Sequence, residues 1–239
     1  MEQGASIPES QIASNGIGQS LRGLAEVFYK PSALFARLKE TPKILAPYVA
    51  LAVLTFVFWW LVKDIFVQTL AQMPEFQERM KDMELTPQME KWMGIGQAIQ
   101  SSLVMLLIPL ATALLAWFWG NFVFAGRAGY RQILSVALYS EIVYAVGNLL
   151  TLPMILARKS MFVSMSLGAL APEKSFSSPL YIALSKLDVF LIWEFIVIGI
   201  GCSIIYGVSR NKGYLLSVLS MGLLSVLSIV WVVISKFVF

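Results

Sequence analysis

The segment from Val189 to Val208 restricts the possible fold more than any other part of this sequence. It contains 20 residues and a single formal charge, that of Glu194. At 1.5 Å per residue, an α-helix of this length covers about 30 Å, which is the thickness of the hydrocarbon core of a bilayer. An acid, Asp188, stands at one end and a base, Arg210, beyond the other. We therefore interpret the segment as a transmembrane helix.

The composition supports a membrane protein. Of the 239 residues, 58% are hydrophobic and 13% are charged, whereas soluble domains average roughly 45–50% apolar and about 25% charged residues. The chain has no histidine and one cysteine, Cys202, so it lacks the commonest general base, the commonest metal ligand and an internal disulfide. We expect no metal, no cofactor and no enzymatic activity. The net charge of +4 is not clustered, so no nucleic-acid partner is expected.

Four further apolar stretches bring the expected number of membrane spans to five. We expect the spans at about residues 44–62, 98–119, 133–157, 189–208 and 215–235. Aromatic and basic residues near their ends, such as Trp59, Trp60 and Lys63, are typical of the membrane–water interface. The sequence predicts an all-α polytopic protein whose residues 44–239 form a five-span membrane domain, with interfacial helices in the N-terminal segment and in the outside loops.

The chain before the first span divides into two parts. Residues 1–20 are polar and contain few large apolar side chains, which predicts a flexible tail. Residues 21–43 place apolar side chains at helical spacing between basic ones, with a break at Pro31. This pattern predicts an amphipathic segment lying on an anionic leaflet. A helix packed on the cytoplasmic end of the protein itself is an equally good explanation.

The loops suggest an orientation and one helix start. Thr86 followed by Pro87 is typical of an N-cap and the first position of a helix. The connections between spans two and three, and between spans four and five, are short and basic. Short basic loops favour the cytoplasmic side. We therefore expect the N-terminus on the cytoplasmic side of the membrane.

A ladder of small residues marks the fourth span. Gly199, Ser203 and Gly207 recur every four residues, a spacing that allows another backbone to approach closely. Asp188 precedes Gly199 by about three helical turns and so lies on the same side. Together with Trp193, these residues form a candidate interface with a partner protein or a second copy. The alternative is packing within the five-helix bundle.

Polar side chains within the spans form a second candidate site. Glu141, Tyr144 and Asn148 share one face of the third span, and Glu194 lies in the fourth. A charge at the centre of a bilayer costs at least roughly 2.5–3.5 kcal/mol, so each acid should face the bundle or be protonated. These groups are candidates for a proton or cation relay. Hydrogen bonding to serines of the fifth span is the alternative.

Two basic residues follow the fourth span. Arg210 and Lys212 stand directly beyond its end, in a connection predicted to be cytoplasmic. Long basic side chains at such positions extend toward lipid phosphates. We interpret both as a lipid-phosphate or cytoplasmic anchor.

Three motifs together resemble a known family. The stretch Leu187–Trp193, the sequence Gly199-Ile200-Gly201 and the stretch Ser209–Gly213 resemble the signature of the YIP family of Ypt/Rab-interacting membrane proteins, in its bacterial branch. Pro31–Phe35 is similar to the family's entry segment, and Gly129–Leu134 to its turn into the third span. The resemblance covers the chain from Pro31 to its C-terminus. It implies five membrane spans and a location in the bacterial cytoplasmic (inner) membrane.

The resemblance also implies a range of functions. Eukaryotic members associate with small GTPases through a long cytosolic N-terminal region, and only about 40 residues precede the first span here, which argues against GTPase binding. Some bacterial relatives are associated with ABC-type exporters or with envelope stress. We therefore expect a non-enzymatic accessory or scaffold protein that contacts membrane lipids and a membrane-protein partner, or forms a homo-oligomer. The alternative is a small transporter, channel or lipid-handling protein using Glu141 and Glu194.

Overall fold

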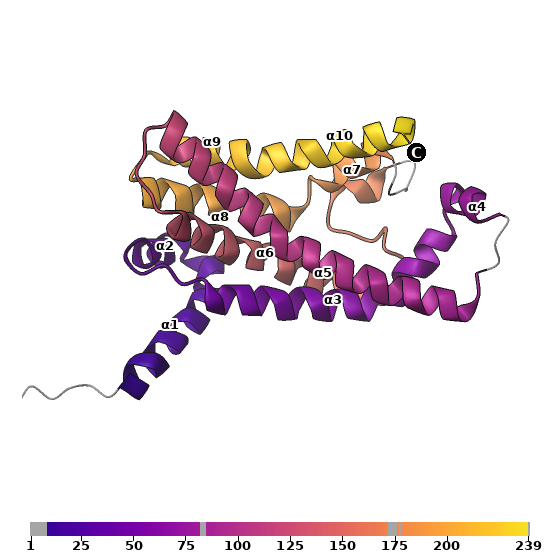
Figure 1. The fold of residues 1–239 in the computed structure, drawn as a ribbon, viewed down its shortest axis with the longest axis horizontal. Coiled ribbons are helices and arrows are strands. Elements are labelled where there is room, and N and C mark those ends of the chain that lie inside the picture. The colour runs from indigo at the N-terminus through magenta and orange to yellow at the C-terminus, as the bar shows by residue number, and fades with distance from the viewer. Residues whose placement is uncertain (1–8, 82–84, 172–175, 177, 239) are drawn as a thin grey trace, which may run out of the picture.

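The computed structural model describes residues 9–81, 85–171, 176 and 178–238, and this part of the chain is helical without β-strands (Figure 1). Five helical segments in it are long and apolar enough to cross a membrane, which confirms the predicted fold class. The elements that form them are α3 (Leu45–Ala71), α5 (Pro87–Phe118) with η1 (Trp119–Val123), α6 (Tyr130–Arg158), α8 (Val189–Tyr206), and α9 (Arg210–Ser217), which continues through η3 (Val218–Gly222) into α10 (Leu223–Val238).

Helix α6 is the centre of the bundle. It packs against α3, α5 and α8, and nearly every residue from Ile133 to Val143 is buried, including the large side chains of Leu138 and Tyr139. A helix that is apolar all round is suited to such a position. The other membrane-crossing helices bury a smaller share of their surface within the protein. Most of the apolar surface that faces lipid therefore belongs to them.

Two helices precede the first span. Helix α1 (Glu9–Tyr29) occupies much of the stretch where the composition predicts a flexible tail; residues 1–8 lie outside the described residues. Pro31 opens α2 (Pro31–Glu40), at a position where its missing N–H costs nothing. Helix α2 packs on α6 and α8 and buries Leu34 and Phe35. This part of the N-terminal segment therefore packs on the protein itself, while the start of α1 points away from the bundle (Figure 1).

The first span is longer than its hydropathy suggests. Helix α3 continues past residue 62 to Ala71. Within this continuation Lys63 bonds to the neighbouring Asp64 at 2.6 Å and lies over the ring of Trp60. After the short helix α4 (Pro74–Met80), α5 begins at Pro87 with Thr86 as its N-cap, as predicted. The described helices of the polar region between residues 63 and 97 are thus the end of α3, α4 and the start of α5.

The connection between α6 and α8 returns to the bundle. It contains the short helices η2 (Leu167–Leu170) and α7 (Pro179–Ser185). Helix α7 packs against α10 and against η2. This connection therefore closes one end of the bundle, where α6 ends and α8 begins.

Candidate functional site

Two buried acids meet in the interior of the bundle. Glu141 of α6 and Glu194 of α8 each expose 2% of their surface, and their carboxyl groups lie within hydrogen-bonding range of each other. A hydrogen bond between two carboxyl groups requires that one of them carry a proton. Apart from the neighbouring carboxyl group, no described residue donates a hydrogen bond to Oε2 of Glu194. The pair therefore has unused capacity to accept a hydrogen bond.

The acid pair borders a cavity of about 570 Å³. The walls come from six elements, η3 with Met221 among them, and their lining residues are mostly apolar. They include Val104, Leu107, Ile108 and Ala111 of α5, Tyr144 of α6, Tyr181 and Ser185 of α7, Leu191 of α8, and Leu224, Ser225 and Ser228 of α10. The cavity is thus lined by the two acids and otherwise mostly by apolar side chains.

The cavity opens toward the lipid-facing side of the protein. Val104 and Leu107, which line it, also expose 49% and 59% of their surface on the outside of α5. On the other side of the opening, α10 contributes Leu224 and Ser228, both half-buried. A hydrophobic chain in the bilayer can therefore reach the cavity by moving sideways between α5 and α10.

Lys186, directly after α7, adds one basic group to the cavity. It is half-buried; burial lowers its pKa, while the negative charge of Glu194 acts in the opposite direction. No acid of the described residues lies within ion-pair distance of its ammonium group. The sequence interpretation did not select this residue, because a lysine in a loop between spans carries no distinguishing pattern.

A second, smaller cavity adjoins the first. It measures about 210 Å³, and the two cavities share Tyr144 in their walls. Asn148 lies within reach of the Tyr144 hydroxyl and lines the smaller cavity with Asp188 and Ser166. The polar face predicted for the third span thus leads from the acid pair toward the α7 end of the bundle.

The small-residue ladder faces a helix of the same chain. A Cβ atom added to Gly199 would lie 2.2 Å from Cδ1 of Tyr214 in α9. A Cβ atom added to Gly213 of α9 would lie 2.2 Å from the Gly199 carbonyl oxygen and 2.7 Å from Cβ of Ser203. Gly207 ends α8 with φ of +66°, a conformation that favours glycine. The ladder thus serves internal packing at its first two positions and helix termination at the third.

The other two candidate interface residues lie at the start of α8. Asp188 is the N-cap: its carboxylate accepts hydrogen bonds from the backbone N–H groups of Phe190 and Leu191, at 2.8 and 3.2 Å. Trp193 exposes 40% of its surface. Asp188 therefore has a structural role in this chain, and Trp193 is the candidate interface residue that remains available to another molecule.

The two basic residues after α8 differ in their surroundings. The guanidinium group of Arg210 donates hydrogen bonds to the Ile200 carbonyl oxygen at 3.2 Å, to Ser203 Oγ at 3.1 Å and to Ser32 Oγ at 2.9 Å. Arg210 therefore holds α9 to α8 and α2. Lys212 is exposed, so it is the better placed of the two to reach a lipid phosphate.

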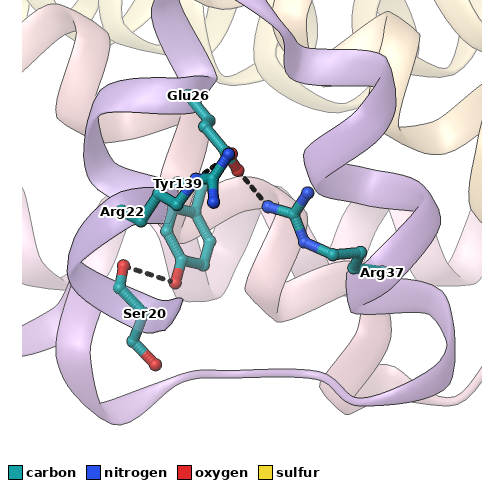
Figure 2. Close-up of polar contacts among 5 residues, drawn as sticks. All are labelled: Ser20, Arg22, Glu26, Arg37 and Tyr139. Atoms are coloured by element: carbon teal, nitrogen blue, oxygen red, sulfur yellow. Dashed lines mark hydrogen bonds and ion pairs between the residues drawn. The ribbon is translucent and has the colours of Figure 1, made fainter. Parts of the chain in front are cut away.

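A third buried acid, Glu26 of α1, was missed by the sequence interpretation. Figure 2 shows it between two arginines: Arg22 Nε lies 2.8 Å from Oε1, and Arg37 of α2 contacts Oε2. Burial raises the pKa of Glu26, but the hydrogen bonds and charges of Arg37 and Arg22 outweigh it, so the net pKa is lowered. In the same cluster the Tyr139 hydroxyl donates to the Ser20 carbonyl oxygen at 3.3 Å. The cluster joins α1 to α2 and α6; the spacing of four between Arg22 and Glu26 was its one sequence signal.

The fold and the buried acid pair define a polytopic helical membrane protein with an intramembrane cavity. Comparison with known proteins identifies its family: the chain matches the Yip1 domain over residues 25–233. The protein belongs to the Yip1 family, as the three motifs of the sequence predicted. It is also similar to Membrane protein YknW of Bacillus subtilis (strain 168), with 23% identity over 234 residues, covering 92% of this chain and 95% of the relative. No solved structure matches the chain.

Proposed function

We propose that this Yip1-family membrane protein binds an amphiphilic molecule, such as a lipid, in the cavity between α5 and α10, and handles it without covalent chemistry. The observation that carries the proposal is the acid pair of Glu141 and Glu194 in a cavity that opens toward lipid, where no described residue other than the neighbouring carboxyl donates to Oε2 of Glu194. This is the lipid-handling alternative that the two acids suggested in the sequence.

Physical considerations support a binding role for the acid pair. Buried charged groups contribute little to stability, and apolar residues of similar volume often replace them without loss. An acid inside a membrane is therefore a functional group by default. A volume of about 570 Å³ lies within the range of roughly 300–1,000 Å³ typical of small-molecule sites. An amphiphile matches both the acidic and the apolar part of the cavity, because its head group can lie at the two acids and its chain along α5 and α10.

The test is photolabelling in nanodiscs with a lipid whose acyl chain carries a photoreactive group. We expect wild-type labelling to concentrate on residues 104–112 of α5 and on residues 221–228, at the end of η3 and the start of α10. Ala111→Trp places a large ring in the cavity, whose wall includes Ala111, and should reduce this labelling at least about fivefold. Ala52→Trp is the matched control, because Ala52 is also half-buried but lines a separate groove between α3 and α5. Equal labelling of all lipid-facing helices, unaffected by Ala111→Trp, would refute the proposal.

An accessory role is the second candidate function. Trp193 projects from α8 beside the exposed side chains of Val189 and Ile192, an apolar patch that suits a second copy or a membrane-protein partner such as an ABC-type exporter or an envelope-stress system. This proposal includes a location in the bacterial cytoplasmic membrane with the N-terminus in the cytoplasm. It is tested by purification in mild detergent with mass spectrometry: Trp193→Ala should remove a stoichiometric partner. Gly199→Leu is unsuitable, because the leucine would collide with Tyr214 inside the chain.

A further inference from the structure

The cavity contains more acidic than basic groups. Glu141 and Glu194 both line it, and Lys186 is the one basic residue among its described lining residues. Lys186 lies near enough to Glu194 for their charges to interact, but not within ion-pair distance of it. When both carboxyl groups are ionised, one ammonium group therefore faces two negative charges, and the site lacks one positive charge.

No other described group near the acid pair supplies that charge. The titratable groups that face the pair or the adjoining cavity are the hydroxyls of Tyr144 and Tyr181 and the carboxyl group of Asp188. The hydroxyls are neutral, and Asp188 is an acid already engaged as the N-cap of α8. In a site of low polarity the missing charge must come from a bound proton or from a cation that enters.

The buried oxygen of Glu194 indicates what kind of cation fits. Oε2 of Glu194 is buried, and no donor group of the described residues other than the neighbouring carboxyl reaches it, so when the shared proton leaves it calls for another donor. A primary ammonium group offers three N–H donors and a positive charge, enough to engage both carboxyl groups. Because the entrance is lined by lipid-exposed side chains of α5 such as Val104 and Leu107, the ammonium would arrive attached to an alkyl chain.

We propose that the cavity selects amphiphiles with a primary ammonium head group, and that the ammonium replaces the proton shared by Glu141 and Glu194. In this exchange the N–H groups of the ammonium bond to the two carboxylates, and the shared proton leaves to water, so the net charge within the cavity does not change. The smaller cavity beyond Tyr144, lined by Asn148 and Asp188, provides a polar route for the proton. This inference rests on the proposed function, because it names the ligand of the same cavity.

The experiment compares two amphiphiles of equal chain length, decylammonium and decanol, as competitors of the photoreactive lipid in nanodiscs. We expect decylammonium to displace the label at a bilayer concentration at least about tenfold lower than decanol, since a hydrogen bond to a charged group is worth about that factor or more. Calorimetry in buffers of different ionisation enthalpy should show release of about one proton per decylammonium bound.

Three variants connect this selectivity to the named groups. Glu194→Gln should abolish both the preference for decylammonium and the proton release. Lys186→Gln should strengthen decylammonium binding several-fold, because it removes the competing cation, and a gain of affinity cannot result from misfolding. Glu90→Gln makes the same change as Glu194→Gln at an exposed position at the start of α5 and should leave every value unchanged.

The outcomes separate this inference from the proposed function. If decanol displaces the label as well as decylammonium does, the cavity binds amphiphiles without regard to their head group, and the inference is overturned while the proposed function stands. A preference for decylammonium without proton release overturns the exchange. If neither compound displaces the label, the proposed function fails as well.

Discussion

Replacing Gly213 by alanine should strongly destabilise the packing of α9 on α8. An added Cβ atom would lie 2.2 Å from the carbonyl oxygen of Gly199, 2.7 Å from Cβ of Ser203 and 3.0 Å from its backbone nitrogen. Two of these three contacts are with backbone atoms, so a change of rotamer cannot relieve them. Overpacking costs about 1–3 kcal/mol, and this site belongs at the upper end. The helical preference of alanine returns roughly 0.5–1 kcal/mol, which leaves a net loss of about 2 kcal/mol.

The measurement is reversible unfolding by SDS from mild-detergent micelles, followed by tryptophan fluorescence. The matched control is Gly96→Ala in α5, where an added Cβ atom meets nothing within 4 Å. This control should stabilise the protein by about 0.5–1 kcal/mol through helix preference alone. If Gly213→Ala is as stable as wild type, or gains stability like the control, then α9 does not cover the small-residue ladder and our account of that surface is wrong.

Three further predictions concern the N-terminal cluster and the start of α8. Glu26→Gln removes the carboxylate shared by two arginines and should lower the free energy of unfolding by about 1 kcal/mol; the loss is this small because the arginines are exposed to solvent. Hydrogen exchange in α1 should become faster in the variant, and unchanged protection of α1 would contradict the prediction. The pKa of Glu26 lies below its ordinary value of 4.5. The stabilisation that Glu26 gives to the contact between α1 and α2 is therefore present above pH 4.5 and is lost as the pH falls through the lowered pKa. The distance between spin labels on α1 and α2 should increase only at this low pH. Asp188→Ala should cost about 1 kcal/mol through loss of the N-cap, whereas Asp188→Asn should retain most of it, as measured by SDS unfolding.

The helices of the bundle were predictable because the signal for them is local. An apolar stretch such as Val189 to Val208 must be long enough to cross the bilayer, whatever surrounds it. The ends of the helices were less predictable: α3 continues beyond residue 62 through the charged pair Lys63 and Asp64, where the hydropathy falls although the helix does not end. Helix α1 likewise contains polar residues that composition alone assigns to a tail.

The candidate site was predictable only in part. Glu141 and Glu194 stood out because acids are rare in membrane spans, but their proximity depends on how α6 packs against α8 and cannot be read from either helix alone. Lys186 joins them because α7 and its connection fold back onto the bundle. The spacing of Gly199 and Ser203 predicted a close approach, but not that α9 of the same chain makes it. Glu26 was not recognised as a candidate, because in the sequence it is a single acid among the basic residues of the N-terminal segment that pair with it.

The most direct test of the proposed function is the amount of amphiphile that remains bound after purification in mild detergent, determined by mass spectrometry of the extracted protein. Wild type and Ala52→Trp should each retain about one molecule per chain, and Ala111→Trp, which fills the cavity bordered by Glu141 and Glu194, should retain far less. If all three proteins carry equal amounts, or none, the cavity between α5 and α10 is not a binding site and the central claim is contradicted.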